Sequence, residues 1–279
     1  MSIEGWQYYN HARIPTAPPT VPAAVEAMAE EGFWHDSRGT VLLARWTSEF
    51  DCRRETGWWY IIKDTPLDLD AMKAKRRYEI TKGQKHFQVR PIVPKEYGQA
   101  LYRVEQAAFA AYPAKYRPQV DWDAFAAGLP NWEDCLAYGA FSRETGELAG
   151  YGLLRYAAPD FLDFLVLEAD PAWEKQGVNA AIVAGILEEN RDFLQRGGIL
   201  CDGARSIHHE TNFQDYLEKY FGFRRAYCVL HLAYPPKIRW AVRAAYPFRG
   251  LLARLDGIGV VHQLNGVLKM EEIVKGEQK

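Results

Sequence analysis

Four side chains around residue 200 are of types that move protons. Asp202 ends an apolar, strand-like run, and His209 and Glu210 follow it at a short distance. A carboxylate or an imidazole within hydrogen-bond reach can accept the proton that an attacking amine must lose, and the hydroxyl of Tyr216 can return a proton to a leaving group. Helix capping is an equally common use of an aspartate, and aromatic residues are frequent in cores, so Asp202 and Tyr216 keep both interpretations.

A glycine turn at Gly177 is the second feature with chemical potential. It follows Pro171 and opens a long apolar stretch with helical spacing. A helix N-terminus presents free amide hydrogens and the positive end of the helix dipole, which suits a phosphate or a pantetheine-like donor. Simple chain reversal is the alternative use of such a turn. The donor-binding residues expected here are Lys175, Gln176, Gly177, Val178, Asn179 and Ala180.

A basic segment at residues 73–90 contains seven Lys and Arg residues and a single acid, Glu79. Such a segment can bind donor phosphates, tRNA or a phosphorylated acceptor. It can equally be an ordinary solvated helix face. Arg76 and Arg77 are the candidates for contact with the donor.

No metal site is expected. His208, His209 and Glu210 are consecutive, so their side chains point in different directions, whereas a metal needs ligands that converge. The four cysteines are far apart in the sequence and form no C-x-x-C pair. Since no secretory leader is evident, reduced thiols and a cytoplasmic location are expected.

The elements that position these residues form a strand, a crossover helix and a second strand. Strands are expected at 161–167 and 199–201, with a helix at 178–194 between them and another helix from 212 to 221. Backbone N–H groups of Leu167 and Glu168, at the end of the first strand, are candidates for stabilising an oxyanion. Further strands are expected at 39–46, 58–62, 86–89, 136–141, 148–156 and 227–234, and further helices at 25–31, 69–81 and 96–111.

The two ends of the chain have patterns of their own. Residues 1–24 are rich in proline and aromatic residues, which predicts an extended arm. Residues 237–254 intersperse basic and aromatic side chains, which predicts an amphipathic helix with its aromatic face packed on the domain. A membrane surface or tRNA is the alternative partner of that helix.

The composition indicates a globular protein with no general affinity for nucleic acid. The chain has 279 residues, of which 48% are hydrophobic, enough for a sizeable core. A formal net charge of −2 creates no global positive field, so DNA binding is not expected. No apolar run approaches the roughly 18 residues that a membrane-spanning helix needs, so no transmembrane segment is expected.

Three segments carry a resemblance to a known superfamily. They are 76–85 with the following Phe87-Gln88-Val89, the turn 171–181, and Leu217-Glu218-Lys219-Tyr220-Phe221-Gly222. Together they resemble the GNAT acyltransferase superfamily, most closely its tandem-repeat branch of Fem-type, peptidoglycan bridge-forming aminoacyltransferases. The resemblance implies an α/β GNAT-like fold with a mixed sheet. It further implies an arm and a degenerate GNAT-like half at residues 1–90, a complete half at 91–236 and a C-terminal helical segment at 237–279.

The function implied is acyl or aminoacyl transfer to a primary amine by direct attack, with no covalent enzyme intermediate. The donor would be an acyl-CoA thioester or an aminoacyl-tRNA ester, and the acceptor a small-molecule or peptide amine, with tRNA as a further partner. The alternative is a GNAT-like binding or scaffold protein that has lost its chemistry. Glu174 and Asn179 in the turn, and Glu218 where many GNAT enzymes have a tyrosine, favour that alternative.

Overall fold

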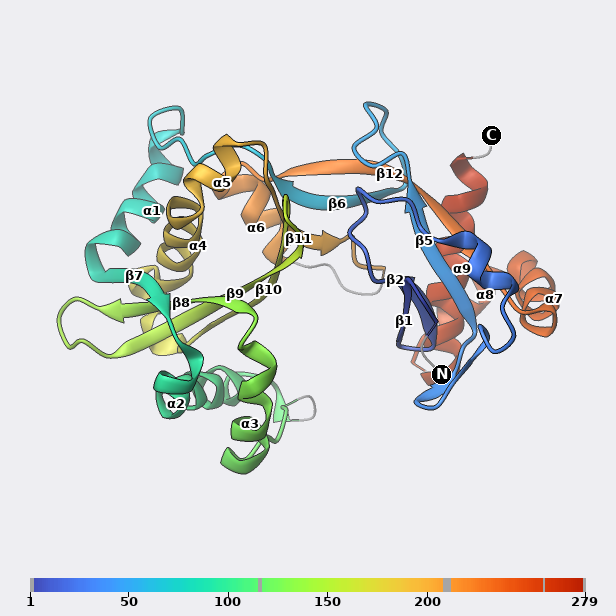
Figure 1. The fold of residues 1–279 in the computed structure, drawn as a ribbon, viewed down its shortest axis with the longest axis horizontal. Coiled ribbons are helices and arrows are strands. Elements are labelled where there is room, and N and C mark those ends of the chain that lie inside the picture. The colour runs from blue at the N-terminus through green and yellow to red at the C-terminus, as the bar shows by residue number, and fades with distance from the viewer. Residues whose placement is uncertain (1–2, 115–116, 208–211, 258, 278–279) are drawn as a thin grey trace. The chain divides into compact units, whose positions relative to one another are not determined.

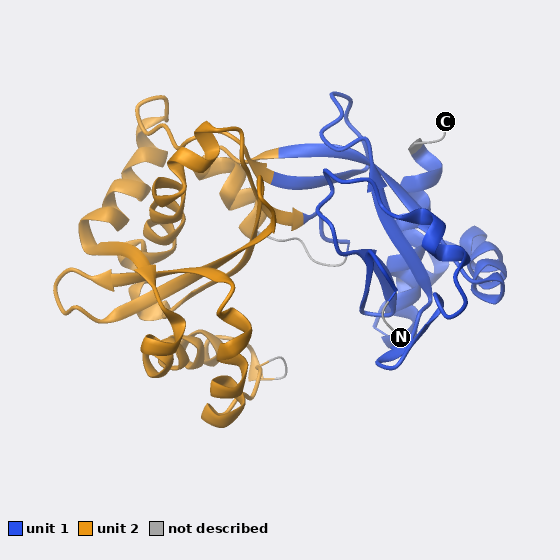
Figure 2. Cartoon of the chain, in the orientation of Figure 1, with its two compact units in different colours: residues 1–61, 204–211, 225–279 blue, residues 62–203, 212–224 orange. Residues whose placement is uncertain are grey.

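The computed structural model describes residues 3–114, 117–207, 212–257 and 259–277, which form two compact units (Figure 2). Unit 1 contains residues 1–61, 204–211 and 225–279, and unit 2 contains residues 62–203 and 212–224. Neither unit is continuous in sequence. The expected division of the chain at 1–90, 91–236 and 237–279 separates two GNAT-like halves and a C-terminal segment. It stays a prediction. No helix in the described part of the chain combines the length and apolar character that crossing a bilayer requires.

Unit 2 is built on a mixed β-sheet. Its strands, in spatial order, are β11 (Ile199–Ala204), β10 (Phe161–Ala169), β9 (Leu148–Ala158), β8 (Cys135–Ser142) and β7 (Phe87–Ile92). The neighbours are antiparallel except β10 and β11, which run parallel. A parallel pair needs a crossover connection, and α4 (Val178–Glu189) supplies it. The strand, helix and strand expected over 161–201 are therefore confirmed.

Helices cover both faces of this sheet (Figure 1). On one face lie α4, α1 (Ala74–His86) and α6 (Asn212–Phe221), and on the other lie α2 (Gly98–Ala110) and α3 (Trp122–Gly128). Helix α4 is apolar on nearly every side because it is buried between the sheet and α1. The expected helix at 178–194 is divided: α4 ends at Glu189, and a short α5 (Arg191–Gln195) follows.

The expected end of α1 at Lys82-Gly83 is wrong, because the helix continues to His86. Gly83 is buried in the contact between α1 and the start of α4. A Cβ placed on Gly83 would lie 2.5 Å from the carbonyl oxygen of Gly177 and 2.9 Å from the amide nitrogen of Ala181. The glycine therefore allows two helix backbones to touch and is no helix stop.

Unit 1 also has paired strands, both parallel and antiparallel. Their spatial order is β1 (Trp6–Tyr9), β2 (Ala12–Pro15), β5 (Leu43–Ser48), β12 (Arg224–Ala233) and β6 (Trp58–Lys63). The expected extended arm is in fact an antiparallel β1–β2 hairpin, and the helix expected at 25–31 is a single 3₁₀ turn, η1 (Val25–Ala29). Trp6 fixes the hairpin, since its ring packs edge-on against both Phe33 and Trp46.

Three helices complete unit 1 (Figure 1): α7 (Pro236–Ala245), α8 (Arg249–Leu252) and α9 (Gly259–Glu277). They bury Val242, Leu268, Met270 and Ile273 in one cluster with Trp58 of β6. The C-terminal segment is thus helical as expected. The expectation that its aromatic face packs on the domain holds for Tyr246 and is wrong for Trp240 and Phe248, which are exposed.

Replacing Gly83 by alanine tests the helix contact. The added methyl group meets backbone atoms, which cannot move aside, so we expect a loss of about 1–3 kcal/mol in the free energy of unfolding. This loss exceeds the gain of about 1 kcal/mol that alanine normally brings to a helix. Gly276→Ala in α9 is the matched control, because nothing lies within 4 Å of its Cβ position. Urea unfolding measures the free energy of unfolding of both variants. If the two variants were equally stable, the close contact at Gly83 would be ruled out.

Candidate active site

The parallel strands β10 and β11 part after a short ladder. They pair only from Phe161–Ile199 to Asp163–Cys201 in the described residues, although both strands continue further. Directly beyond, the register of β10 against β9 shifts between Phe164 and Val166, which marks a β-bulge. A bulge bends its strand and increases the local twist. The edge of β10 that faces β11 is therefore open from this point on.

Asp202 lies where the strands part, one residue after the last paired residue, Cys201. Burial raises the pKa of its carboxyl to about 7, against a smaller lowering by a hydrogen bond from Gln214 of α6. A carboxyl with a pKa near neutral suits proton transfer at physiological pH. The position and the pKa both support the interpretation of Asp202 as a proton acceptor over that of a helix cap.

The amides of Leu167 and Glu168 lie beyond the bulge. Their residues pair with Gly152 and Tyr151 of β9. Adjacent residues of a strand direct their N–H groups to opposite edges. One of the two amides thus faces β9, and at most one faces the open edge, where it could stabilise an oxyanion.

The turn before α4 has the geometry of a helix N-terminus without a side-chain cap. Gly177 has φ +84° and is the N-cap, and its carbonyl accepts the first helical hydrogen bond, from Ala181. No acidic residue lies in the first turn of α4. The amides of Val178, Asn179 and Ala180 come before the first intrahelical bond and can donate to a ligand.

Helix α1 covers part of this turn through the contact of Gly83 with Gly177. Gln176 and Asn179 flank the turn in sequence. Their side-chain oxygens are buried and have no hydrogen-bond donor among the described residues. A buried, unpaired acceptor costs about 1–3 kcal/mol. These two oxygens are therefore places where a ligand N–H or O–H would gain a hydrogen bond.

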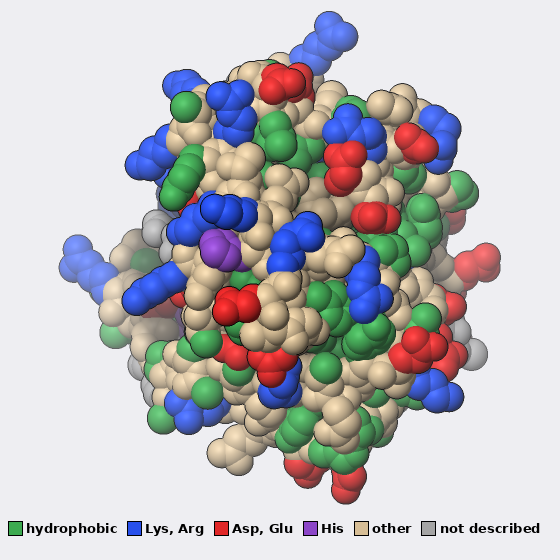
Figure 3. Space-filling model, turned by 90° about the vertical axis from the view of Figure 1, so that its left-hand side faces the viewer, with side chains coloured by type: hydrophobic (Ala, Val, Ile, Leu, Met, Phe, Trp, Pro, Cys, Tyr) green, Lys and Arg blue, Asp and Glu red, His purple; other side chains and the backbone are tan. Residues whose placement is uncertain are grey.

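The basic residues of α1 are not gathered at the turn. Arg76 and Arg77 precede Gly83 by six or seven residues, which is roughly 10 Å along the helix. Arg77 lies 4.0 Å from a carboxylate oxygen of Asp70. Figure 3 shows Lys and Arg side chains spread over the face on the side of α1, with Asp and Glu side chains among them. Lys175 is exposed at the end of the turn.

The sequence does not reveal a half-buried pair of acids, Glu105 and Glu168, beside Tyr151 on the α2 side of the sheet. The Tyr151 hydroxyl donates to Glu105 of α2 at 3.4 Å, and Tyr151 lies opposite Glu168 on the neighbouring strand. Burial raises the pKa of Glu168, and the charge of Glu105 raises it further. Burial also raises the pKa of Glu105.

The available signal was the position of Glu105 in its helix. Leu101, Val104 and Ala108 form the apolar stripe of α2, and Glu105 occupies the i+4 slot from Leu101 in that stripe. A charged residue at such a slot is buried and costly unless it is used.

Tyr216 belongs to an aromatic cluster on α6. Its ring lies 5.1 Å from that of Tyr220 and 5.4 Å from that of Phe221, measured between ring centroids. Burial raises the pKa of its hydroxyl, and the nearby Glu79 adds to the effect. The hydroxyl therefore stays protonated at neutral pH and keeps a proton to donate.

Two of the expected catalytic residues, His209 and Glu210, lie outside the described residues. Within the described ranges, no group of three or more His, Cys, Asp or Glu side chains could hold a metal ion.

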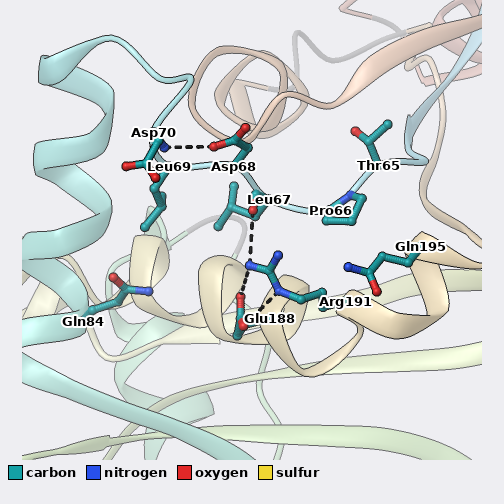
Figure 4. Close-up of a pocket in the computed structure, with 10 residues that line it drawn as sticks. All are labelled: Thr65, Pro66, Leu67, Asp68, Leu69, Asp70, Gln84, Glu188, Arg191 and Gln195. Atoms are coloured by element: carbon teal, nitrogen blue, oxygen red, sulfur yellow. Dashed lines mark hydrogen bonds and ion pairs between the residues drawn. The ribbon is translucent and has the colours of Figure 1, made fainter.

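A separate cavity of about 670 Å³ lies at the other end of α4 (Figure 4). Arg191 lies in its wall, donating to Glu188 at 2.7 Å and to the carbonyl oxygen of Leu67 at 3.4 Å. Glu188 is eleven residues beyond Gly177, roughly 16 Å along the helix. The cavity has the size of a small-molecule site. Gln84, the neighbour of Gly83 in α1, also lines it.

The stability of the protein should depend on pH through Asp202. Its folded pKa of about 7 is above the ordinary 3.8, so the unfolded state loses the proton first and stability falls as pH rises from about 4 to about 7. Relative to Asp202→Asn, which does not titrate, the wild type should lose roughly 1–3 kcal/mol between about pH 4 and about pH 8. Urea unfolding of both proteins at each pH measures this. If the difference in unfolding free energy between the wild type and Asp202→Asn did not change with pH, the Asp202 carboxyl would not be desolvated.

No protein-family model matches this sequence, and no curated protein matches it. Solved structures do match. The structure of L-PGS from Bacillus licheniformis is 12% identical, with a TM-score of 0.50 over 82% of this chain and 79% of that one. At this identity the likeness shows the fold alone.

Two further solved structures are similar at lower TM-scores. A conserved protein of unknown function from Bacteroides thetaiotaomicron is 12% identical (TM-score 0.48, 69% of this chain, 62% of that one). PaiA N-acetyltransferase from Thermoplasma acidophilum, in complex with coenzyme A, is 17% identical (TM-score 0.34, 47% of this chain, 87% of that one). The prediction of a mixed α/β, GNAT-like fold is confirmed.

Proposed function

We propose that this protein is an N-acyltransferase that moves an acyl group to a primary amine by direct attack. The observation that carries the proposal is the opening between β10 and β11, with Asp202 at the point where the strands part. An opened strand edge offers an amide to the donor carbonyl, and a carboxyl of near-neutral pKa beside it can take the proton of the amine. A cytoplasmic location is part of the proposal.

The proposed step is one substitution at a carbonyl carbon. The carboxylate of Asp202 accepts a proton from the acceptor ammonium, and the free amine attacks the carbonyl. A C–N bond forms, the oxyanion receives a backbone N–H of Leu167 or Glu168, and the C–S or C–O bond to the donor breaks. The leaving sulfur or ribose oxygen takes the proton of the Tyr216 hydroxyl, which is the proposed acid. Tyr216 regains a proton from the nitrogen, which loses its second proton as the amide forms.

The donor in this proposal is an acyl-CoA or an aminoacyl-tRNA, as in the Fem-type branch. The amides of Val178 to Ala180 and the buried oxygens of Gln176 and Asn179 supply hydrogen-bonding groups for either donor at the turn. The number of basic residues in α1, which include Arg76 and Arg77, favours the donor with more phosphates, aminoacyl-tRNA. No feature of the site selects one acceptor amine.

A binding or scaffold protein of the same fold is the second candidate. The contact of Gly83 with Gly177 supports it, because α1 covers part of the turn that would hold the donor. In that case Asp202 would have no catalytic role, although its carboxyl is buried.

Donor binding separates the two candidates. We expect calorimetric titration to detect binding of acetyl-CoA, a longer acyl-CoA or charged tRNA. The binding should require the phosphates of the donor. Adenosine without phosphates is the control and should not bind, because the turn recognises anions. If none of the three donors binds, the proposed enzyme is ruled out.

Asp202→Asn tests the proton acceptor with whichever donor binds. We expect kcat/KM for release of the leaving group, with a mixture of amino acids, polyamines and short peptides as acceptors, to fall at least about 100-fold while donor affinity is retained. The wild-type rate should rise through about pH 7, where Asp202 loses its proton, and the variant should lack this rise.

Asp163→Asn is the matched control. Asp163 is also a half-buried aspartate whose pKa burial raises, but it pairs with Cys201, one residue before Asp202. Successive residues of a strand face opposite sides of the sheet, so Asp163 and Asp202 lie on opposite faces. Activity should stay close to that of the wild type; an equal loss in both variants would indicate a structural role for Asp202.

A further inference from the structure

Helices α7 and α8 and the 3₁₀ turns that follow each of them expose large hydrophobic side chains. Trp240 is 70% exposed, Phe248 61%, Leu251 60% and Leu255 47%. All four lie within sixteen consecutive residues of the chain, 240–255. We refer to these four side chains and the basic residues among them as the α7–α8 surface.

These four exposed side chains are not part of the hydrophobic core of unit 1. The inward side of the same segment, with Ile238, Val242, Tyr246 and Leu252, packs against the sheet and α9 (Figure 1). The segment is therefore apolar on two sides. Core packing explains the inner set and leaves the outer set unexplained.

The charged residues of the segment that carries this surface are all basic. Five basic residues and no Asp or Glu occur between Tyr234 and Asp256, in a chain whose formal net charge is −2. Arg249 lies 3.8 Å from Glu272 of α9, and Arg243 lies over the ring of Trp240 at 5.9 Å. The basic residues are Lys237, Arg239, Arg243, Arg249 and Arg254.

We propose that the α7–α8 surface binds an anionic phospholipid bilayer and lies in its interface. Basic side chains attract acidic headgroups, and Trp, Phe and Leu side chains enter the boundary between headgroups and acyl chains. With 10 residues, α7 has half the length needed to cross the hydrocarbon layer, so it lies along the surface.

The hydrophobic residues favour a bilayer over a nucleic acid. The phosphates of RNA would reward the arginines but would leave Leu251 and Leu255 in water, whereas lipid rewards both kinds of side chain. This inference does not depend on the proposed acyl transfer, since it concerns residues of unit 1 alone.

Cosedimentation of the full chain with vesicles tests the proposal. The protein should bind vesicles of equimolar phosphatidylcholine and phosphatidylglycerol, bind pure phosphatidylcholine far more weakly, and dissociate as salt is added. Arg243→Gln with Arg254→Gln should weaken partition about fivefold for each arginine removed. Trp240→Ser with Leu251→Ser should weaken it at least about tenfold.

Matched controls lie on α1. Arg76→Gln with Arg77→Gln makes the same charge change on the other basic helix, and Tyr78→Ser removes a side chain that is 61% exposed there. Both should leave vesicle binding unchanged. Circular dichroism melting curves establish that every variant is folded.

Three outcomes would overturn the proposal. The first is no binding to anionic vesicles, and the second is binding that the α1 variants reduce as much as the α7–α8 variants. The third is a dimer, seen by light scattering, that dissociates in Trp240→Ser with Leu251→Ser, because the surface would then bind a second copy of the chain.

Discussion

The parallel strands β10 and β11 hold together over three residues and then separate, and the proposed chemistry depends on this separation. A register shift of β10 against β9 follows directly, between Phe164 and Val166, and a bulge of this kind bends its strand. The cost is a strand edge without a ladder and a carboxyl, Asp202, held in a poorly solvated place. Packing of α4 and α6 on the same face keeps this arrangement in position, and one hydrogen bond from Gln214 offsets part of the desolvation of Asp202.

The contact between α1 and α4 has two consequences for the proposed donor site. It fixes the start of α4, since Gly83 allows the two backbones to touch at Gly177. It also limits the approach to the amides at that start. A donor must reach them from the side that α1 leaves open. The side-chain oxygens of Gln176 and Asn179 are buried and lack donors among the described residues. The same helix thus supports the turn and restricts it.

Much of the fold could be predicted from local patterns. The strands of unit 2 and the helix α4 have the alternating or continuous apolar sequences that such elements require, and the turn residues between them are unambiguous. Asp202 was identified by residue type at the end of a buried strand. Gly83 was misread as a helix stop because its role depends on Gly177, ninety-four residues away in the chain. Trp240 was misplaced because only tertiary packing decides which side of α7 is buried. Glu105 differs, since its place in the apolar stripe of α2 can be read from the sequence.

The titration of the Asp202 carboxyl is the most direct test of this account. Carbon-13 NMR of protein labelled at the aspartate carboxyl, with Asp202→Asn used to assign the resonance, gives its pKa in the folded protein. We expect an apparent pKa of about 7. A value near the ordinary 3.8 would show that water solvates the carboxyl freely, and Asp202 would then not be a proton acceptor suited to neutral pH.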